Sequence, residues 1–155
     1  MTSRREFLVL ACGAIATTVE AQLDPNRETL RKAALKEALR KVVGDAQVRH
    51  GKVKLDLPPL IDNGNAVPVS VTVDSPMTPA DHVRAIHVFT EKNPQPNIIS
   101  AWLGPRAGRA SLTTRARIAD TGSVYALAQM SDGSFWSDRA EVVVTLSACL
   151  EDGLI

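Results

Sequence analysis

The spacing of hydrophobic residues changes once along the chain, near Gly51. Before this point, apolar residues recur at helical spacing between residues 25 and 43, and Arg and Lys fill the opposite face. Asp24 and Pro25 supply capping and first-turn chemistry, and Gly44 is typical of a helix end. The sequence therefore predicts an amphipathic helix that packs on the domain or caps its edge, with a dedicated docking helix as the alternative. Its predicted apolar face comprises Leu30, Ala33, Ala34, Ala38, Leu39 and Val42.

After Gly51, apolar and polar residues alternate with a period of two, as in half-buried strands. The clearest run is 67–73, where valine occupies every second position and Pro68 indicates an edge strand or a bulge. Turn residues, such as those at 62–65, separate the apolar runs. We therefore expect an all-β fold, an immunoglobulin-like antiparallel β-sandwich of about seven strands preceded by the N-terminal helix. The expected strands are 52–57, 67–73, 82–89, 97–103, 110–118, 123–130 and 140–147.

The first 21 residues have the features of an export signal. Arg4 and Arg5 precede Phe7 and Leu8, and an apolar stretch then runs to about residue 18. This stretch is shorter than the roughly 20 residues that span a bilayer. We predict a twin-arginine signal peptide at 1–21, a periplasmic location and no membrane insertion. The alternative is lipoprotein processing, which would make Cys12 a lipid-bearing N-terminus.

Length and charge limit the function of the remaining chain. Removal of residues 1–21 from the 155 leaves about 134 residues, enough for one domain, and keeps the formal net charge at +1. This balanced charge argues against nucleic acid or an anionic membrane surface as a partner. We expect a helical segment at 22–50, the sandwich at 51–147 and a C-terminal arm at 148–155.

Motifs for catalysis and metal binding are missing from the sequence. No nucleophile elbow, phosphate-binding loop or zinc-binding H-E-x-x-H occurs, and the acidic residues form no obvious pair. His82 and His87 lie five residues apart on one expected strand, so they point to opposite faces and do not share an ion. We expect His87 to be a hydrogen-bonded core residue, and we expect no metal or organic cofactor.

Two surface features admit more than one interpretation. Phe135 and Trp136 follow a turn at 131–134, where they either cover the end of the sandwich or form a partner interface. Four arginines could bind an oxyanion together or could belong to a solvated strand face. They are Arg106, Arg109, Arg115 and Arg117.

Cys149 is the one cysteine that remains after removal of the predicted signal. An exported protein ordinarily pairs its cysteines within the chain, and Cys149 has no second cysteine to pair with. Three roles for Cys149 therefore stay open. It forms an intermolecular disulfide, it holds a covalent cargo on its sulfur, or it has no functional role. The spacing favours no Cys–His nucleophile pair with this residue.

Several runs of the sequence share their residues and order with one known family. They are Ile61–Val69, Val73–Met77, Ile86–Phe89, Lys92–Pro96, Pro105–Arg109 and Met130–Trp136. With these runs the chain resembles the SoxY family, the sulfur-carrier subunit of bacterial thiosulfate-oxidising systems. The resemblance extends from about residue 52 to Cys149 and includes the twin-arginine signal.

The resemblance implies a non-catalytic carrier. Members of the family form a heterodimer with a SoxZ subunit and hold sulfur-oxidation intermediates covalently on a cysteine, as a persulfide or a thiosulfate adduct, while partner enzymes act on them. The resemblance places this attachment at Cys149 and implies c-type cytochrome and hydrolase components as further partners. The family arm has glycines on both sides of the cysteine, whereas this chain has Ser147 and Ala148 before it and Leu150 and Glu151 after it.

Three functions therefore stay open at the level of sequence. The first is a sulfur carrier loaded on Cys149. The second is a SoxY paralogue that carries nothing and acts as an interaction, scaffold or redox-sensing module. The third is an enzyme. Turnover of a sulfur compound by the isolated protein would indicate this function.

Overall fold

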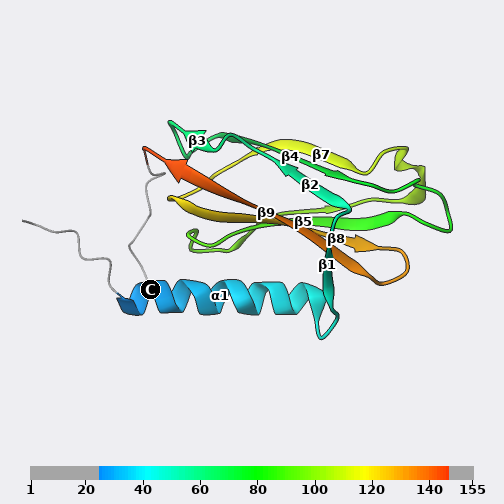
Figure 1. Ribbon diagram of the computed structural model, residues 1–155, viewed down its shortest axis with the longest axis horizontal. Helices are drawn as coiled ribbons and strands as arrows, with labels where there is room; N and C mark the ends of the chain where they lie inside the picture. Colours follow the sequence, from blue (N-terminus) through cyan, green and yellow to red (C-terminus); the bar gives the residue numbers. More distant parts are fainter. Residues whose placement is uncertain (1–24, 147–155) are drawn as a thin grey trace, which may run out of the picture.

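The computed structural model describes residues 25–146, and these form one helix packed against two β-sheets (Figure 1). Helix α1 spans Pro25–Val43, and the predicted stop is confirmed at Gly44, whose φ of +63° suits a residue without a Cβ. Nine strands follow within the described range, together with a short 3-10 helix, η1 (Pro105–Ala107). The strands are β1 (Val48–His50), β2 (Val53–Asp56), β3 (Leu60–Ile61), β4 (Val67–Val73), β5 (Val83–Thr90), β6 (Asn97–Trp102), β7 (Ser111–Ala116), β8 (Gly122–Met130) and β9 (Phe135–Val144).

The strands are arranged in a large sheet and a small one. The large sheet has the order β1-β9-β8-β5-β6, and β3 also pairs with β9; the small sheet has the order β2-β4-β7. Their inner faces enclose one core, while α1 lies across the outer face of the large sheet (Figure 1). The predicted β-sandwich with a preceding helix is thus confirmed.

The alternating pattern of residues 67–73 builds the middle of the core. β4 is the central strand of the small sheet, and its four valines are each at most 4% exposed. They pack against inward-facing residues of β5 and β8, such as Ile86 and Val124. Burial of these β-branched side chains is the main force that joins the two sheets.

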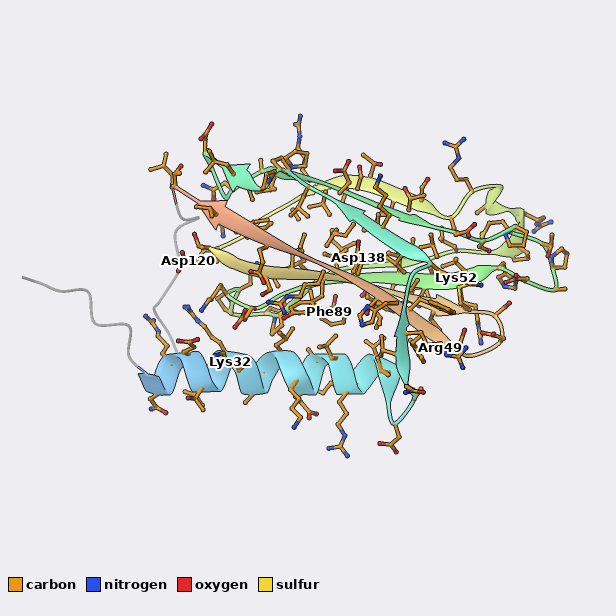
Figure 2. The ribbon with its side chains drawn as sticks, viewed as in Figure 1. Lys32, Arg49, Lys52, Phe89, Asp120 and Asp138 are labelled. Atoms are coloured by element: carbon orange, nitrogen blue, oxygen red, sulfur yellow. The ribbon has the colours of Figure 1, made fainter. Side chains whose placement is uncertain are left out.

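A second apolar cluster joins α1 to the large sheet. Leu35 packs with Phe89, Leu127 and Phe135, each from a different strand, and Figure 2 shows Phe89 between the sheet and the helix. Because residues of β5 and β8 face apolar surroundings on both sides, these strands have lost the alternation of a half-exposed strand.

Pro68 lies in a central strand, yet at its position the strand has only one neighbour. The pairing of β2 with β4 ends at Asp56 and Ser70, whereas β7 pairs with β4 through Pro68 without a break. The missing N–H of proline is therefore tolerated, because β2 ends before it reaches this level. Pro68 thus has an edge position only in the sense that β2 does not reach it, since β4 as a whole is a central strand. No bulge occurs at Pro68.

The predicted apolar face of α1 was wrong in its N-terminal half. Leu30 is 61% exposed, and Ala33 and Ala34 are exposed as well. The buried stripe instead runs through Leu35, Ala38, Leu39, Val42 and Val43, because the apolar surface of Phe89 and Phe135 lies opposite these residues.

Two strand starts differ from those expected, and two strands are additional. β9 begins at Phe135 rather than at residue 140, and β5 begins after His82, so the two histidines do not share a strand. β1 and β3 were not expected at all, and both pair in parallel with β9. β1 occupies the last three residues of the predicted helical segment 22–50.

One hydrogen bond ties the edges of the two sheets together. Asp138, from β9, points between the sheets (Figure 2), and its Oδ2 accepts the N–H of Leu55 in β2 at 2.8 Å. β2 is an edge strand, so this carboxylate satisfies a backbone donor that no neighbouring strand reaches.

Candidate functional site

The five predicted residues of the cysteine arm lie outside the described residues. These are Ser147, Ala148, Cys149, Leu150 and Glu151. The structure does describe the chain up to Leu146, three residues before Cys149. We call Val144, Thr145 and Leu146 the arm base.

Hydrogen bonds to two separate segments, one at Thr121 and one at 61–64, fix the arm base to the sandwich. The N–H of Val144 donates to Thr121 Oγ1 at 2.9 Å, and the N–H of Thr145 donates to the carbonyl of Ile61 at 2.9 Å. The carbonyl of Leu146 then accepts the N–H of Gly64 at 3.1 Å. The arm therefore leaves from a fixed position at one end of the sandwich, where Figure 1 shows the arrowhead of β9 beside β3.

An exposed apolar patch borders the arm base. Leu60, Val143 and Leu146 are 59%, 51% and 67% exposed, and Leu60 pairs with Val143 across β3 and β9. Large apolar side chains that cluster on a surface indicate a contact surface more strongly than single ones do.

The four arginines of the sequence fall into two pairs at opposite ends of β7. Arg106 lies in η1 and Arg109 follows it, before β7 starts. Arg115 lies near the end of β7, and Arg117 follows that strand. A strand of this length separates the pairs by roughly 20 Å, so one small oxyanion does not contact all four.

Arg117 is held beside the arm base by Asn65. Its Nε and Nη2 both donate to Asn65 Oδ1, at 3.3 and 3.1 Å. The same asparagine follows Gly64, which binds the carbonyl of Leu146. The sequence predicts only a turn at residues 62–65, and no local pattern connects that turn with Arg117 or with the arm.

Phe135 and Trp136 differ in their environments. Phe135 is 5% exposed and packs in the cluster beneath α1. Trp136 keeps part of its ring at the surface, where the cationic groups of Arg49 and Lys52 lie 5.8 and 5.2 Å from the ring centroid. Figure 2 shows Arg49 and Lys52 at the end of the sandwich away from the arm base. A partner interface at this end stays a prediction. Trp136 has a partly accessible ring there, and Trp102, which pairs with Ala85 towards the same end of the large sheet, is 76% exposed.

His87 is a hydrogen-bonded core residue, as expected. Its Nδ1 shares a hydrogen bond of 2.8 Å with Ser100 Oγ, and its ring packs against Phe89 and Trp102. Burial lowers the pKa of His87 below the ordinary value of 6.5. Within residues 25–146, no three His, Cys, Asp or Glu side chains are grouped so that they could hold a metal ion.

The fold defines the class of protein, a two-sheet β-sandwich with an N-terminal helix across one sheet. The family model for the sulfur oxidation protein SoxY matches residues 39–149, and the chain belongs to the SoxY family. None of the curated protein sequences matches the chain significantly.

Solved structures agree with this assignment. The sulfur carrier protein SoxY from Chlorobium limicola f. thiosulfatophilum superimposes with a TM-score of 0.62 at 25% identity, and the match covers 74% of this chain and 99% of that one. A superoxide reductase (neelaredoxin) from Ignicoccus hospitalis has a TM-score of 0.54 at 20% identity, over 61% of this chain and 80% of its own. The similarity to the reductase concerns the fold alone.

The helix of the described region is not a membrane span. Over residues 25–146, no helix is long and apolar enough to cross a bilayer.

Proposed function

We propose that this protein is a periplasmic carrier that holds thiosulfate-derived sulfur covalently on Cys149, as a heterodimer with a SoxZ-like subunit. The observation that carries the proposal is the extent of the family match, which runs from residue 39 to residue 149 and so ends on Cys149 itself. The fixed arm base supports it, because a thiol three residues beyond Leu146 stays tethered to a rigid body. In this proposal the protein is not an enzyme, because it presents bound substrate to partner enzymes.

The chemistry of a thiol suits this task. The Cys149 thiol and the outer sulfur of thiosulfate form one S–S bond. This oxidation releases one proton to solvent and two electrons, and a c-type cytochrome partner accepts the electrons. A hydrolase partner then adds water to the adduct, which releases sulfate and leaves a persulfide on Cys149. A short tether lets the same thiol visit both partners at high local concentration.

The twin-arginine signal at 1–21 supports export to the periplasm, where these partners act. The partly exposed ring of Trp136, beside two cationic side chains, is the proposed partner interface at the far end of the sandwich. The exposed side chains of Leu60, Val143 and Leu146 support a second contact surface beside the arm.

We expect a reductant-sensitive adduct on Cys149 in cells that grow on thiosulfate. The measurement is the intact mass of the protein with and without a thiol reductant, followed by peptide mapping. Cys149→Ser should fold normally, since residue 149 lies beyond the last strand, and should carry no adduct. Unimpaired growth of the Cys149→Ser strain on thiosulfate, with no second SoxY encoded, would contradict the proposal.

A second candidate function is a paralogue that binds the SoxZ-like subunit but carries no cargo. Leu150 and Glu151 favour it, because bulk and negative charge beside the thiol hinder entry into narrow active sites and disfavour anionic cargo. In that case the protein would dimerise tightly while Cys149 stays a free thiol under the same growth conditions.

A further inference from the structure

Gly64 connects the arm base to the segment that carries Arg117. Its N–H donates to the carbonyl of Leu146 at 3.1 Å, and its own carbonyl accepts the N–H of Ile118 at 2.8 Å. Leu146 and Ile118 therefore lie on opposite sides of one buried glycine. Because Arg117 directly precedes Ile118, its guanidinium extends from the backbone next to the point where the arm leaves.

Two asparagines orient the guanidinium of Arg117. The side-chain N–H of Asn65 donates to Asn63 Oδ1 at 3.0 Å, which leaves Asn65 Oδ1 to accept the two bonds from Arg117. A third asparagine, Asn93, is 8% exposed and donates to the backbone carbonyl of Arg117 at 2.9 Å. The guanidinium keeps further N–H donors for a ligand, since an arginine has five.

A groove of about 470 Å³ lies beside these residues. It runs between β6 and β7, the edge strands of the two sheets, and residues of the loop that contains Asn93 also line it. Arg115 and Arg117 line one wall, and Asn97 and Ile98 line the other. The lining also includes apolar residues, namely Pro94, Ile99 and Ala116. The groove thus combines apolar surface with amide groups and two arginines, and the arginines suit a small anion.

No carboxylate of the described region neutralises these two arginines. The ion pairs found among residues 25–146 involve Lys32, Lys92 and Arg139 instead. Asp120 lies at the same end of the sandwich (Figure 2), but its Oδ1 accepts the N–H of Thr121 and it forms no ion pair with Arg117. An arginine stays protonated throughout the physiological range, so the groove has a permanent positive charge.

We propose that this groove binds the terminal sulfonate of the thiosulfate adduct carried on Cys149, with Arg117 as the main contact and Arg115 as the second. This inference rests on the proposed carrier function. Cys149 follows Leu146 by three residues, which reach at most about 10 Å, and the adduct extends this further. A sulfonate accepts two parallel N–H bonds from a guanidinium, as carboxylates and phosphates do.

Such a site gives the loaded arm a resting position on the sandwich. The tail adds Glu151 and Asp152 next to the thiol, and their negative charges repel an anionic adduct. Arg115 and Arg117, which form no ion pair with a carboxylate of residues 25–146, offset that repulsion. The site therefore accounts for how a chain with an acidic arm can hold an anionic cargo.

The proposal can be tested by loading the protein chemically. Full-length protein with Cys12→Ser is treated with tetrathionate: the Cys149 thiolate attacks a central sulfur, forms the S–S bond of the adduct and releases thiosulfate. We expect loading to shift the Nε–H resonance of Arg117 in NMR spectra, assigned by its loss in Arg117→Gln. Loading of Cys149 that is verified by mass but leaves this resonance unchanged would overturn the inference and leave the carrier function intact.

Free thiosulfate gives a second test that does not need a loaded cysteine. In the Cys149→Ser protein, Arg117→Gln should weaken thiosulfate binding about fivefold, the upper range for a partly exposed ion pair. Arg106→Gln, at the opposite end of β7, is the matched control and should bind thiosulfate as the parent does. Equal affinities in the two variants would overturn the proposal. Free thiosulfate that binds at Arg117 while Cys149 carries no adduct in cells would also overturn the proposal. In that case the groove would bind a free anion and not the cargo attached to Cys149.

Discussion

At the scale of single residues, His87 couples the stability of the sandwich to pH. It is 6% exposed and lies between Phe89 and Trp102, so a charged imidazole there loses its water without gaining a carboxylate. Ser100, its hydrogen-bond partner, is also bonded to Asn97. This environment favours the neutral ring, which is why the pKa of His87 is lowered.

We expect the free energy of unfolding to fall as pH decreases below about 6.5, the ordinary histidine pKa. Between that value and the lower folded-state pKa, the unfolded chain binds a proton that the folded chain does not, so acid favours unfolding. Urea unfolding at pH 7.5 and pH 5.5 measures the loss. His87→Gln should lose less stability over this interval, while His50→Gln, an exposed histidine, should behave as the parent does. Equal losses in all three proteins would contradict the assignment.

Residue roles were predictable where local sequence decides them. The pattern around His87 was sufficient to predict a core histidine, and the lone Cys149 stood out by its position. The contacts of Arg117 with Asn65 and of Leu55 with Asp138 were not predictable, because they join residues 52 and 83 positions apart. Only the pairing of the sheets brings these side chains together.

At the scale of elements, α1 shows how a helix face depends on the surface it covers. Two apolar stripes of the helix share Ala38, Leu39 and Val42, and they differ in whether Leu30 or Leu35 continues them. Sequence spacing does not distinguish the two. The large sheet presents Phe89 and Phe135 to the second stripe, so Leu35 is buried and Leu30 is not.

Leu35→Ala should lower the free energy of unfolding by about 2–4 kcal/mol, because it removes a buried side chain and leaves a cavity. Leu30→Ala makes the same chemical change on the exposed side of the helix and should alter stability by no more than about 0.5 kcal/mol. Denaturant unfolding monitored by circular dichroism measures both. Equal effects of the two substitutions would mean that the helix packs through a different face.

Strands with a long regular apolar pattern were predictable, whereas very short strands and interrupted patterns were not. β4 and β8 have enough alternating or apolar residues to stand out, whereas β1 and β3 have three and two residues and acquire their structure by pairing with β9. The start of β9 was missed because Ser137, Asp138 and Arg139 interrupt the apolar pattern. Asp138 is polar there because it binds the edge of the other sheet.

At the scale of the whole molecule, the sandwich separates two ends with different features. One end has Trp136 with its two cations, and the other has the arm base, the apolar patch and the arginine groove. β9 connects these ends, because Trp136 is its second residue and Val144, the first residue of the arm base, is its last. A subunit bound at the first end would leave the second free for the enzymes that act on the cargo.

If the proposed carrier function holds, we expect the composition of the arm to limit exchange with partner enzymes. Glycines beside a carrier cysteine bend freely and occupy little width, whereas Leu150 adds bulk and Glu151 adds charge. We expect Leu150→Gly combined with Glu151→Gly to raise the rate of thiosulfate loading by a c-type cytochrome partner about fivefold, equivalent to about 1 kcal/mol. The rate is measured as the growth of the adduct mass over time.

The matched control makes the same reduction in bulk and charge further from the thiol, with Asp152→Gly and Leu154→Gly. If width at the active-site entrance limits loading, only the pair next to Cys149 should accelerate it. If both double variants load faster to the same extent, total tail charge is responsible rather than the shape of the arm. If neither accelerates loading, the arm is already accepted as it stands, and the partner enzymes have an entrance that fits a leucine and a glutamate beside the cysteine.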